Sequence, residues 1–312
     1  MDYGPFHIAE EFFLNFTSEN TRNSYRRDLK QFLDFVQNHF PEIKNFDDIG
    51  VDQILTYRNS LMQAGGQKGD SASNKTIARK LAALSSLFKH MVGKNQVKTN
   101  PLLSIKRPRP DARRPTQALS AENVEKILNL AYQNKTSGPL HYFLLVAFFT
   151  TGLRKSELLF RKFGDIKKHG DFFILEYEGK GSKRGQKRLH PLFLEAYEEY
   201  REWMLNKDRE VGQEDWLFQP SKNPSDPKNV NKPLNPKTIN EILSSYARKL
   251  GIGRVTPHSA RATFITRLLE QGIDLYDVSQ EVQHSSVTTT QIYDKRRRNL
   301  EDSPVTKLKY SA

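Results

Sequence analysis

The sequence PHSARATFITRLLEQG, residues 257–272, places His258 and Arg261 at the beginning of an amphipathic helix. The two side chains are three positions apart, so they share one face of that helix. A helix N-terminus already attracts anions through its free N–H groups and its dipole. An imidazole and a guanidinium added there make a site for an oxyanion such as a phosphate. Because this spacing occurs by chance about half a time in a chain of this composition, the motif needs support from other parts of the sequence.

The same helix carries signals for its start and for its buried face. Thr256 is a good N-cap residue, and Pro257 fits the first helical turn. Ile265 and Leu268 continue the stripe that begins with the two cationic residues. We therefore expect both cationic side chains to point inward, at the top of a packed helix, and not into water.

Three other stretches hold residue types that could act on the same anion. In TGLRKSELL, Arg154 follows an apolar segment and a glycine, and Glu157 is spaced to pair with its guanidinium. EGKGSKRGQKR puts Lys180 between glycines at a strand end or turn. QHSSVTTTQIYDK contains His284 and, nine residues on, Tyr293. Each residue alone also fits an ordinary structural role, so only their combination supports a functional hypothesis.

The first part of the chain has the pattern of a helical domain. Apolar spacing predicts helices over 18–40, 51–63 and 74–92, with a short one over 8–16, and these would form a compact four-helix domain. The segment 98–120 then has four prolines, and six basic residues lie between positions 98 and 114. We interpret it as an extended interdomain linker that follows a nucleic-acid backbone; a solvated surface loop is the alternative.

The second part mixes helical and alternating patterns. Alternation over 171–192, with Gly and Lys in its middle, predicts a hairpin or small sheet. The segment 140–152 is apolar on nearly all sides, which indicates a buried helix. Further helices are predicted over 121–133, 192–206, 236–250 and 258–271. The fold class is therefore mainly α with a small antiparallel β-sheet.

Composition limits the kind of partner. The chain has 312 residues, which suggests about two domains, and its net charge is +13 with a pI near 9.6. Basic residues exceed acidic ones in both halves, as expected if both halves touch one polyanion such as nucleic acid or an anionic membrane surface. A merely soluble basic protein is the alternative.

Other classes are excluded or disfavoured. The absence of cysteine excludes disulfides, Cys-type zinc sites and thiol nucleophiles. No carboxylate cluster suggests a metal site, and we expect no cofactor. No apolar run approaches 18 residues, and the first residues are acidic and too short in apolar length for a signal peptide. We expect a cytoplasmic protein with no membrane contact.

Taken in order, the motifs closely resemble those of the tyrosine recombinase (phage integrase) family. That family shows T-G-L-R-x-S-E-L, G-K-G-x-K-x-R before P-L, H-x-x-R, and G-H-x-x-x-x-T-T-x-x-Y. Here they stand as TGLRKSEL, GKGSKRGQKRLHPL, HSAR and QHSSVTTTQIY. NTRNSYRRDLKQFLDF and KTIARKLAALSSLFKHMVGKNQVKTNP resemble the family's core-binding helices. The resemblance covers nearly the whole chain and favours a two-domain, Xer-like enzyme.

The resemblance implies a domain plan and an activity. The plan is an N-terminal helical core-binding (SAM-like) domain at 1–104, a basic proline-rich linker at 105–118, and an α+β catalytic domain with a C-terminal tail at 119–312. The activity is site-specific recombination that cuts and rejoins duplex DNA through a 3′-phosphotyrosine intermediate, without metal or ATP. Integration or excision of a mobile element and resolution of dimers both remain open as biological roles.

The resemblance also implies which residues act. Tyr293 would attack the scissile phosphate. Arg154 and Arg261 would bind the non-bridging oxygens of that phosphate, and Glu157 would orient the Arg154 guanidinium. An ammonium would protonate the leaving 5′-oxygen, one histidine would accept or relay the tyrosine proton, and the other would donate a hydrogen bond to the phosphate. The implied catalytic set is Arg154, Lys180, His258, Arg261, His284 and Tyr293.

Basic residues on the predicted core-binding helices and in the linker are candidates for contact with double-stranded DNA. They are Arg26, Arg27, Arg79, Lys80, Lys106, Arg107, Arg109, Arg113 and Arg114. The two domains would close as a clamp on the duplex, and recombination would need a homo-tetramer on paired sites, although the free protein could be monomeric. The tail beyond Tyr293 would reach a neighbouring subunit; a frayed basic terminus is the alternative.

Two positions depart from the family pattern, and two rival functions remain. Gln283 stands where the family usually has glycine, which could alter the turn that presents His284. The hairpin tip is long, so Lys183 is an alternative to Lys180 for the same role, although the G-K-G match favours Lys180.

The alternative functions are a DNA-binding relative without catalysis, which should lack some of these residues, and a type IB topoisomerase-like enzyme, which should lack the helical first domain.

Overall fold

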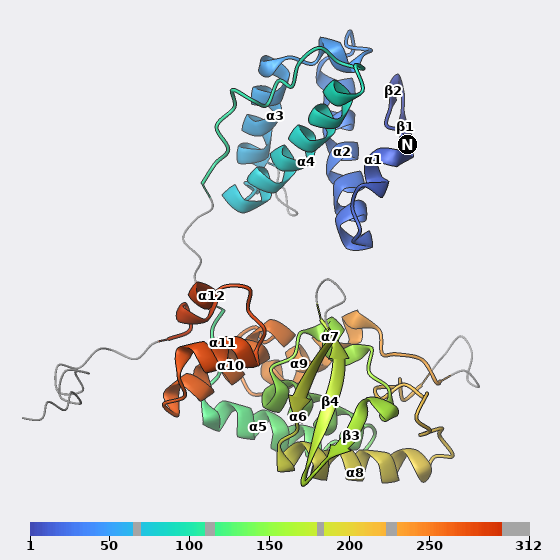
Figure 1. The fold of residues 1–312 in the computed structure, drawn as a ribbon, viewed down its shortest axis with the longest axis vertical. Coiled ribbons are helices and arrows are strands. Elements are labelled where there is room, and N and C mark those ends of the chain that lie inside the picture. Colours follow the sequence, from blue (N-terminus) through green and yellow to red (C-terminus); the bar gives the residue numbers. More distant parts are fainter. Residues whose placement is uncertain (65–69, 110–115, 180–183, 223–229, 295–312) are drawn as a thin grey trace, which may run out of the picture. The chain divides into compact units, whose positions relative to one another are not determined.

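The computed structural model describes residues 1–64, 70–109, 116–179, 184–222 and 230–294. The chain divides into two compact units, Met1–Arg114 and Pro115–Ala312 (Figure 1). Each unit has its own apolar core. The division falls inside the 105–118 range predicted as a linker. The predicted fold class is confirmed: both units are mostly helical, and the second carries a small antiparallel sheet.

The first unit is a helical bundle preceded by a small hairpin. Its strands are β1 (Asp2–Tyr3) and β2 (Phe6–His7), and its helices are α1 (Glu10–Leu14), α2 (Glu19–His39), α3 (Val51–Ala64) and α4 (Asn74–Gly93). Helix α4 packs on α2 and α3 and buries one apolar stripe that includes Ile77, Leu81 and Leu84. The hairpin was not predicted because strands of two residues are too short to show alternation.

A buried carboxylate ties α2 to α4. Asp28 is 1% exposed and accepts hydrogen bonds from Arg79 and, at 3.2 Å, from the Lys80 Nζ. Lys80 also donates to Gln31. A buried ion is tolerated when it is paired and hydrogen-bonded in this way.

The second unit is built around one largely buried helix. Its elements are α5 (Ala121–Tyr132), α6 (Gly138–Thr151), α7 (Lys155–Leu159), β3 (Ile166–His169), β4 (Phe172–Glu178), β5 (Arg184–Arg188), α8 (Pro191–Leu205), α9 (Pro236–Lys249), α10 (Pro257–Glu270), α11 (Leu275–Glu281) and α12 (Val287–Gln291). Helix α6 is apolar on nearly all sides, as its sequence predicts, and it contacts α5, α8 and α10.

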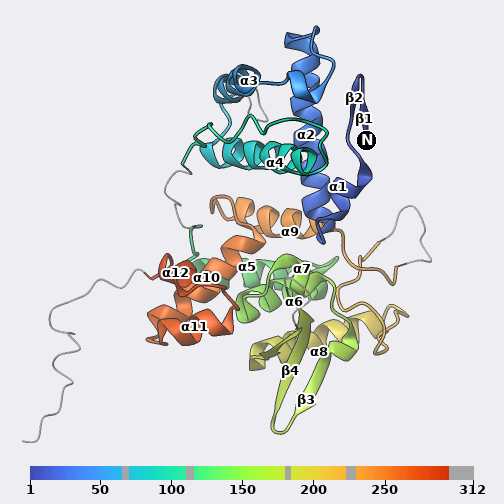
Figure 2. The same cartoon turned by 45° about the horizontal axis from the view of Figure 1, so that its top comes forward.

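The strands and the last helices flank this core. The sheet order is β3-β4-β5, and both pairs are antiparallel. Helices α10, α11 and α12 gather together in both views of the molecule (Figures 1 and 2). The sequence did not predict α7, α11 and α12, because helices of five to seven residues have too little periodicity to detect. In the part of the chain that the structure describes, no helix is long and apolar enough to span a membrane.

Candidate active site

The end of α6 and the start of α7 place Arg154. Helix α6 stops at Gly152, whose φ of 62° is left-handed, and Arg154 then caps α7. Glu157 is 3% exposed; one of its carboxylate oxygens accepts from the Arg154 main-chain N–H at 2.8 Å, and the other accepts from the Arg154 Nη1 at 2.6 Å. The predicted pairing of these two residues is therefore present, and it holds both the backbone and the guanidinium of Arg154.

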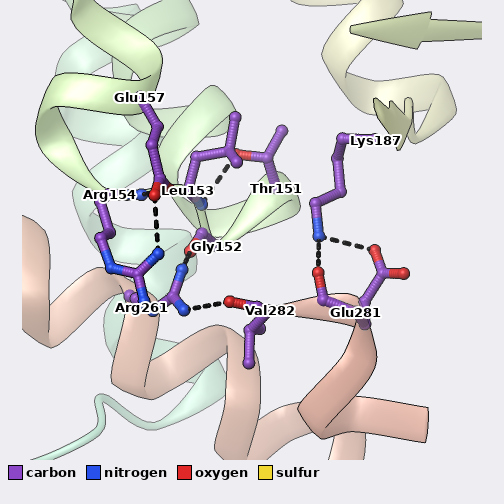
Figure 3. Close-up of polar contacts among 9 residues, drawn as sticks. All are labelled: Thr151, Gly152, Leu153, Arg154, Glu157, Lys187, Arg261, Glu281 and Val282. Atoms are coloured by element: carbon purple, nitrogen blue, oxygen red, sulfur yellow. Dashed lines mark hydrogen bonds and ion pairs between the residues drawn. The ribbon is translucent and has the colours of Figure 1, made fainter. Parts of the chain in front are cut away.

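Arg261 lies beside Arg154 (Figure 3). Its helix, α10, begins as predicted, with Thr256 as the N-cap that accepts from the Ser259 N–H. The guanidinium is fixed by two main-chain carbonyls: Nη1 donates to Gly152 at 2.7 Å, and Nη2 donates to Val282. Burial and the nearby charge of Arg154 lower the pKa of Arg261 to about 10, so it remains a cation at neutral pH.

His284 follows α11 and is linked to α12. Its main-chain N–H donates to the Ser279 carbonyl at 3.0 Å, and its Nδ1 lies 2.8 Å from the Oγ1 of the fully buried Thr290. The Thr290 carbonyl in turn accepts from the Tyr293 N–H at 2.9 Å. Thr290 thus connects the segment that presents the imidazole to the segment that presents the phenol.

The charges of these side chains influence one another. Burial, followed by the charges of Arg261, Arg154 and His258, lowers the pKa of His284 to about 4. Tyr293 is 8% exposed and packs on α10 and α11, and its electrostatic influence reaches Arg261. These five residues come from four segments, because His258 and Arg261 share α10. Lys180 and its rival Lys183 lie outside the described residues.

One predicted orientation is wrong. Arg261 is 4% exposed, as expected, but His258 is exposed to solvent. His258 is the second residue of α10, and residues three apart on a helix differ by about 60° in direction. The apolar stripe therefore buries one side chain of the pair and leaves the other at its edge.

The predicted DNA contacts fall into two groups: side chains exposed to solvent, and side chains paired with carboxylates of the protein. Arg27, Lys106, Arg107 and Arg109 are exposed, while Arg113 and Arg114 lie outside the described residues. Arg26 pairs with Glu10 and covers the Phe13 ring. Arg79 is exposed but paired with Asp28.

Lys80 requires a correction. Its side chain is only 8% exposed and is held by Asp28 and Gln31, so it does not face a ligand. Lys80 lies on the same stripe of α4 as buried apolar residues, and the internal carboxylate explains a cation at that position. We remove it from the candidate DNA contacts.

Several contributing groups were not predicted. The carbonyls of Gly152 and Val282 and the hydroxyl of Thr290 have no sequence signature, because main-chain acceptors belong to any residue. Lys187 is 2% exposed and bonds to Glu281, and alternation along β5 could have indicated that it faces inward. Among the described residues, no three His, Asp or Glu side chains are grouped as metal ligands.

The comparisons with known proteins agree with the motifs. The model of the phage integrase family matches residues 117–299, and that of the phage integrase N-terminal SAM-like domain matches residues 14–95. Tyrosine recombinase XerC of Herpetosiphon aurantiacus is 30% identical over 279 residues, covering 88% of this chain and 84% of the relative. Tyrosine recombinase XerD of Oceanobacillus iheyensis is 30% identical over 287 residues, covering 88% and 87%.

Solved structures share the fold. A lambda integrase dimer bound to a COC′ core site matches with a TM-score of 0.68 and 17% identity, over 94% of this chain and 96% of that one. XerH recombinase in its pre-cleavage complex with difH matches with a TM-score of 0.67 and 20% identity, over 88% and 77%.

The chain belongs to the phage integrase family of tyrosine recombinases, enzymes that cleave and rejoin DNA through a tyrosine intermediate. It is a site-specific DNA recombinase, as its motifs predicted.

Proposed function

We propose that Tyr293 is the nucleophile and that the surrounding cations bind the scissile phosphate. The observation that carries this proposal is the crowding of positive charge around a buried phenol. Arg154 and Arg261 lie together, and their charges help to lower the pKa of His284. Such a cluster is costly when empty, and a phosphodiester would supply the negative charge that it lacks.

The reaction forms one bond and breaks another. The Tyr293 Oη bonds to phosphorus and loses its proton, the bond from phosphorus to the 5′-oxygen breaks, and that oxygen takes a proton. The DNA 3′-phosphate is then joined to Tyr293, and attack by another 5′-hydroxyl reverses these steps. Because the phosphotyrosine keeps the energy of the broken ester, the exchange needs no ATP.

The two arginines have the largest electrostatic task. Negative charge grows on the non-bridging oxygens as phosphorus is attacked, and a guanidinium can donate two hydrogen bonds to them. One well-placed arginine accelerates other phosphoryl transfers by about 10³ to 10⁵. Arg261 is held at both Nη atoms by carbonyls and Arg154 by Glu157, so both guanidiniums are oriented before the phosphate arrives.

The histidines and the lysine handle protons and hydrogen bonds. The Nδ1 of a neutral His284 can accept a hydrogen bond from the Thr290 hydroxyl. In that tautomer the ring proton is on Nε2, which can donate to a phosphate oxygen. We assign His258, which is exposed at the start of α10, to accept or relay the Tyr293 proton. We assign Lys180 as the acid that protonates the leaving 5′-oxygen.

We further propose that the domains at 1–104 and 119–312 close on the duplex from two sides, with exposed cations such as Arg27 and Arg107 on phosphates. Exchange between two sites needs two cuts in each duplex, and therefore four protomers. The residues beyond Tyr293 would join neighbouring protomers.

Trapping the covalent intermediate tests the nucleophile. Sites recovered by mapping the DNA bound in cells are made as nicked duplexes, so that the cleaved strand diffuses away and the adduct accumulates. The wild-type protein should give an SDS-stable adduct, and Tyr293→Phe should give none. Tyr276→Phe alters an exposed tyrosine of α11 and serves as the control that cleaves normally.

Two outcomes would overturn the proposal. An adduct formed by the Tyr293→Phe protein would place the nucleophile elsewhere. Relaxation of supercoiled plasmid without site preference, and without recombinant products from paired sites, would instead favour the topoisomerase-like alternative.

A further inference from the structure

Lys187 is a buried cation next to the active-site cluster. Its side chain is 2% exposed on the inner face of β5, whereas its neighbours Gln186 and Arg188 face outward. The Nζ donates to the main-chain carbonyl of Glu281 and, at 2.8 Å, to the Oε1 of the same residue (Figure 3). One ammonium therefore holds both the backbone and the carboxylate of a single residue.

A buried lysine at position 187 is unfavourable for stability. Burying an ammonium is unfavourable unless it is paired, and an apolar residue of similar volume is often as good or better for stability. Burial lowers the pKa of Lys187, and the Glu281 carboxylate and, more weakly, Glu157 oppose that effect. The positive charge of Arg261 disfavours it further. Stability alone therefore gives little reason for a cation here.

The residue that Lys187 holds leads directly into the active site. Glu281 ends α11, and the next residue, Val282, supplies the carbonyl that accepts from the Arg261 Nη2. Gln283 then turns the chain through a left-handed φ of 49°, and His284 follows. A shift of the Glu281 backbone would therefore move the Val282 carbonyl that accepts from Arg261. It would also move the turn that positions His284.

Lys187 also touches the other support of Arg261. Its Nζ lies 5.6 Å from the centroid of the Phe264 ring, which is within cation–π range. That ring packs so closely over Gly152 that a Cβ there would collide with it. The Gly152 carbonyl is the second acceptor of the Arg261 guanidinium. Lys187 is thus linked to both carbonyls that aim Arg261.

We infer that Lys187 is a positioning residue for DNA cleavage, which fixes the end of α11 against β5 so that the Val282 carbonyl aims Arg261 and the following turn presents His284. It does not touch the phosphate in this role. The inference rests on the proposed function of Arg261 and His284, and it predicts that losing Lys187 slows the chemical step while DNA binding is retained.

The test measures single-turnover adduct formation on the nicked site, with site affinity and thermal unfolding measured in parallel. Lys187→Met keeps the bulk and removes the charge, and Glu281→Ala removes the half-exposed carboxylate without touching the buried lysine. Lys168→Met, on the exposed face of β3, loses the same charge and is the matched control. We expect cleavage to fall about 10- to 100-fold in Lys187→Met, since a misplacement of about 1 Å can cost about 10². Glu281→Ala should lose less because the main-chain contact remains, and site affinity should change less than about threefold.

A modified substrate separates positioning of Arg261 from an effect on the leaving group. With sulfur in place of the scissile 5′-oxygen, the leaving thiolate needs no proton, because thiols are far more acidic than alcohols. The Lys187→Met defect should persist on this substrate. Rescue to the wild-type rate would overturn the inference, as would cleavage within twofold of wild type on normal DNA. If Lys187→Met does not fold, an unimpaired Glu281→Ala would overturn it as well.

The controls separate this inference from the proposed function. Wild-type protein that forms no adduct would contradict the proposed function itself. Wild-type protein that cleaves beside an inactive Tyr293→Phe, with Lys187→Met equally fast, would contradict only the positioning role.

Discussion

The residues around Tyr293 carry positive charge that favours the binding of an anion. Arg261 and His284 both have lowered pKa values, each first because of burial and then because of neighbouring cations. A protein selected only for stability would place carboxylates among these groups, yet Glu157 is already committed to Arg154. The free protein therefore holds its cations at a cost, and that cost should fall when an anion binds.

The pKa of His284 should report this relief directly. In the free protein its ring should titrate near pH 4, well below the usual 6.5. A bound phosphate adds negative charge near the ring and favours its protonated form, so the pKa should rise by at least about one unit on site DNA. The measurement is an NMR titration of the ring nitrogens of Tyr293→Phe protein, with and without the duplex. A free-state value near 6.5, or a fall on binding, would contradict the charge cluster.

At the scale of elements, the junction between α6 and α7 links stability to catalysis. Gly152 ends α6 with a left-handed φ, lies under the Phe264 ring, and offers its carbonyl to Arg261. The position thus requires glycine for two independent reasons, its backbone angle and its lack of a Cβ. The TGLR motif that signals Arg154 therefore also encodes the support of Arg261.

Replacing Gly152 with alanine should therefore damage both properties. The left-handed angle alone costs about 1 to 2 kcal/mol with a side chain, and crowding against Phe264 should add about 1 to 3 kcal/mol. Gly251→Ala is the matched control, since its φ is 66° and nothing lies within 4 Å of its added Cβ. Denaturant unfolding should show the larger loss for Gly152→Ala, and only that variant should also cleave more slowly. Equal losses would mean that Phe264 yields without cost.

The sequence was informative where one local rule decides the structure. Thr256 caps its helix as predicted, and the segment that is apolar on nearly all sides became the largely buried α6. It was less informative where tertiary context decides. The burial of Lys80 depends on Asp28, fifty-two residues away, and the exposure of His258 depends on where the packing of α10 ends.

At Gln283, both a local rule and the tertiary context decide the structure. Its φ of 49° explains in physical terms why glycine suits that position, because only glycine adopts the left-handed region without strain. The glutamine nevertheless keeps the turn, and its side chain lies over Gly185 of β5. The motif alone could not foretell that a neighbouring glycine makes room for the substitution.

At the scale of the whole molecule, the positive charge is spread over both units, each of which has its own core. A duplex held by such a protein displaces condensed counterions, so log K should fall linearly with log salt, by about 0.9 per phosphate contacted. The slope therefore counts contacts and can distinguish cations that meet DNA from cations that serve the fold.

Arg27 and Lys80 of the first unit make this distinction measurable, since each loses one positive charge when replaced. Arg27 is exposed on α2, so Arg27→Ala should weaken binding and reduce the magnitude of the slope by about one. Lys80 is buried on Asp28, so Lys80→Met should leave the slope unchanged. It should instead destabilise the unit by about 1 to 3 kcal/mol, less than for a lone buried pair, because Arg79 still holds the carboxylate. Fluorescence anisotropy of a labelled site between about 50 and 200 mM salt gives the slopes. A lower slope for Lys80→Met with unchanged stability would restore Lys80 as a DNA contact.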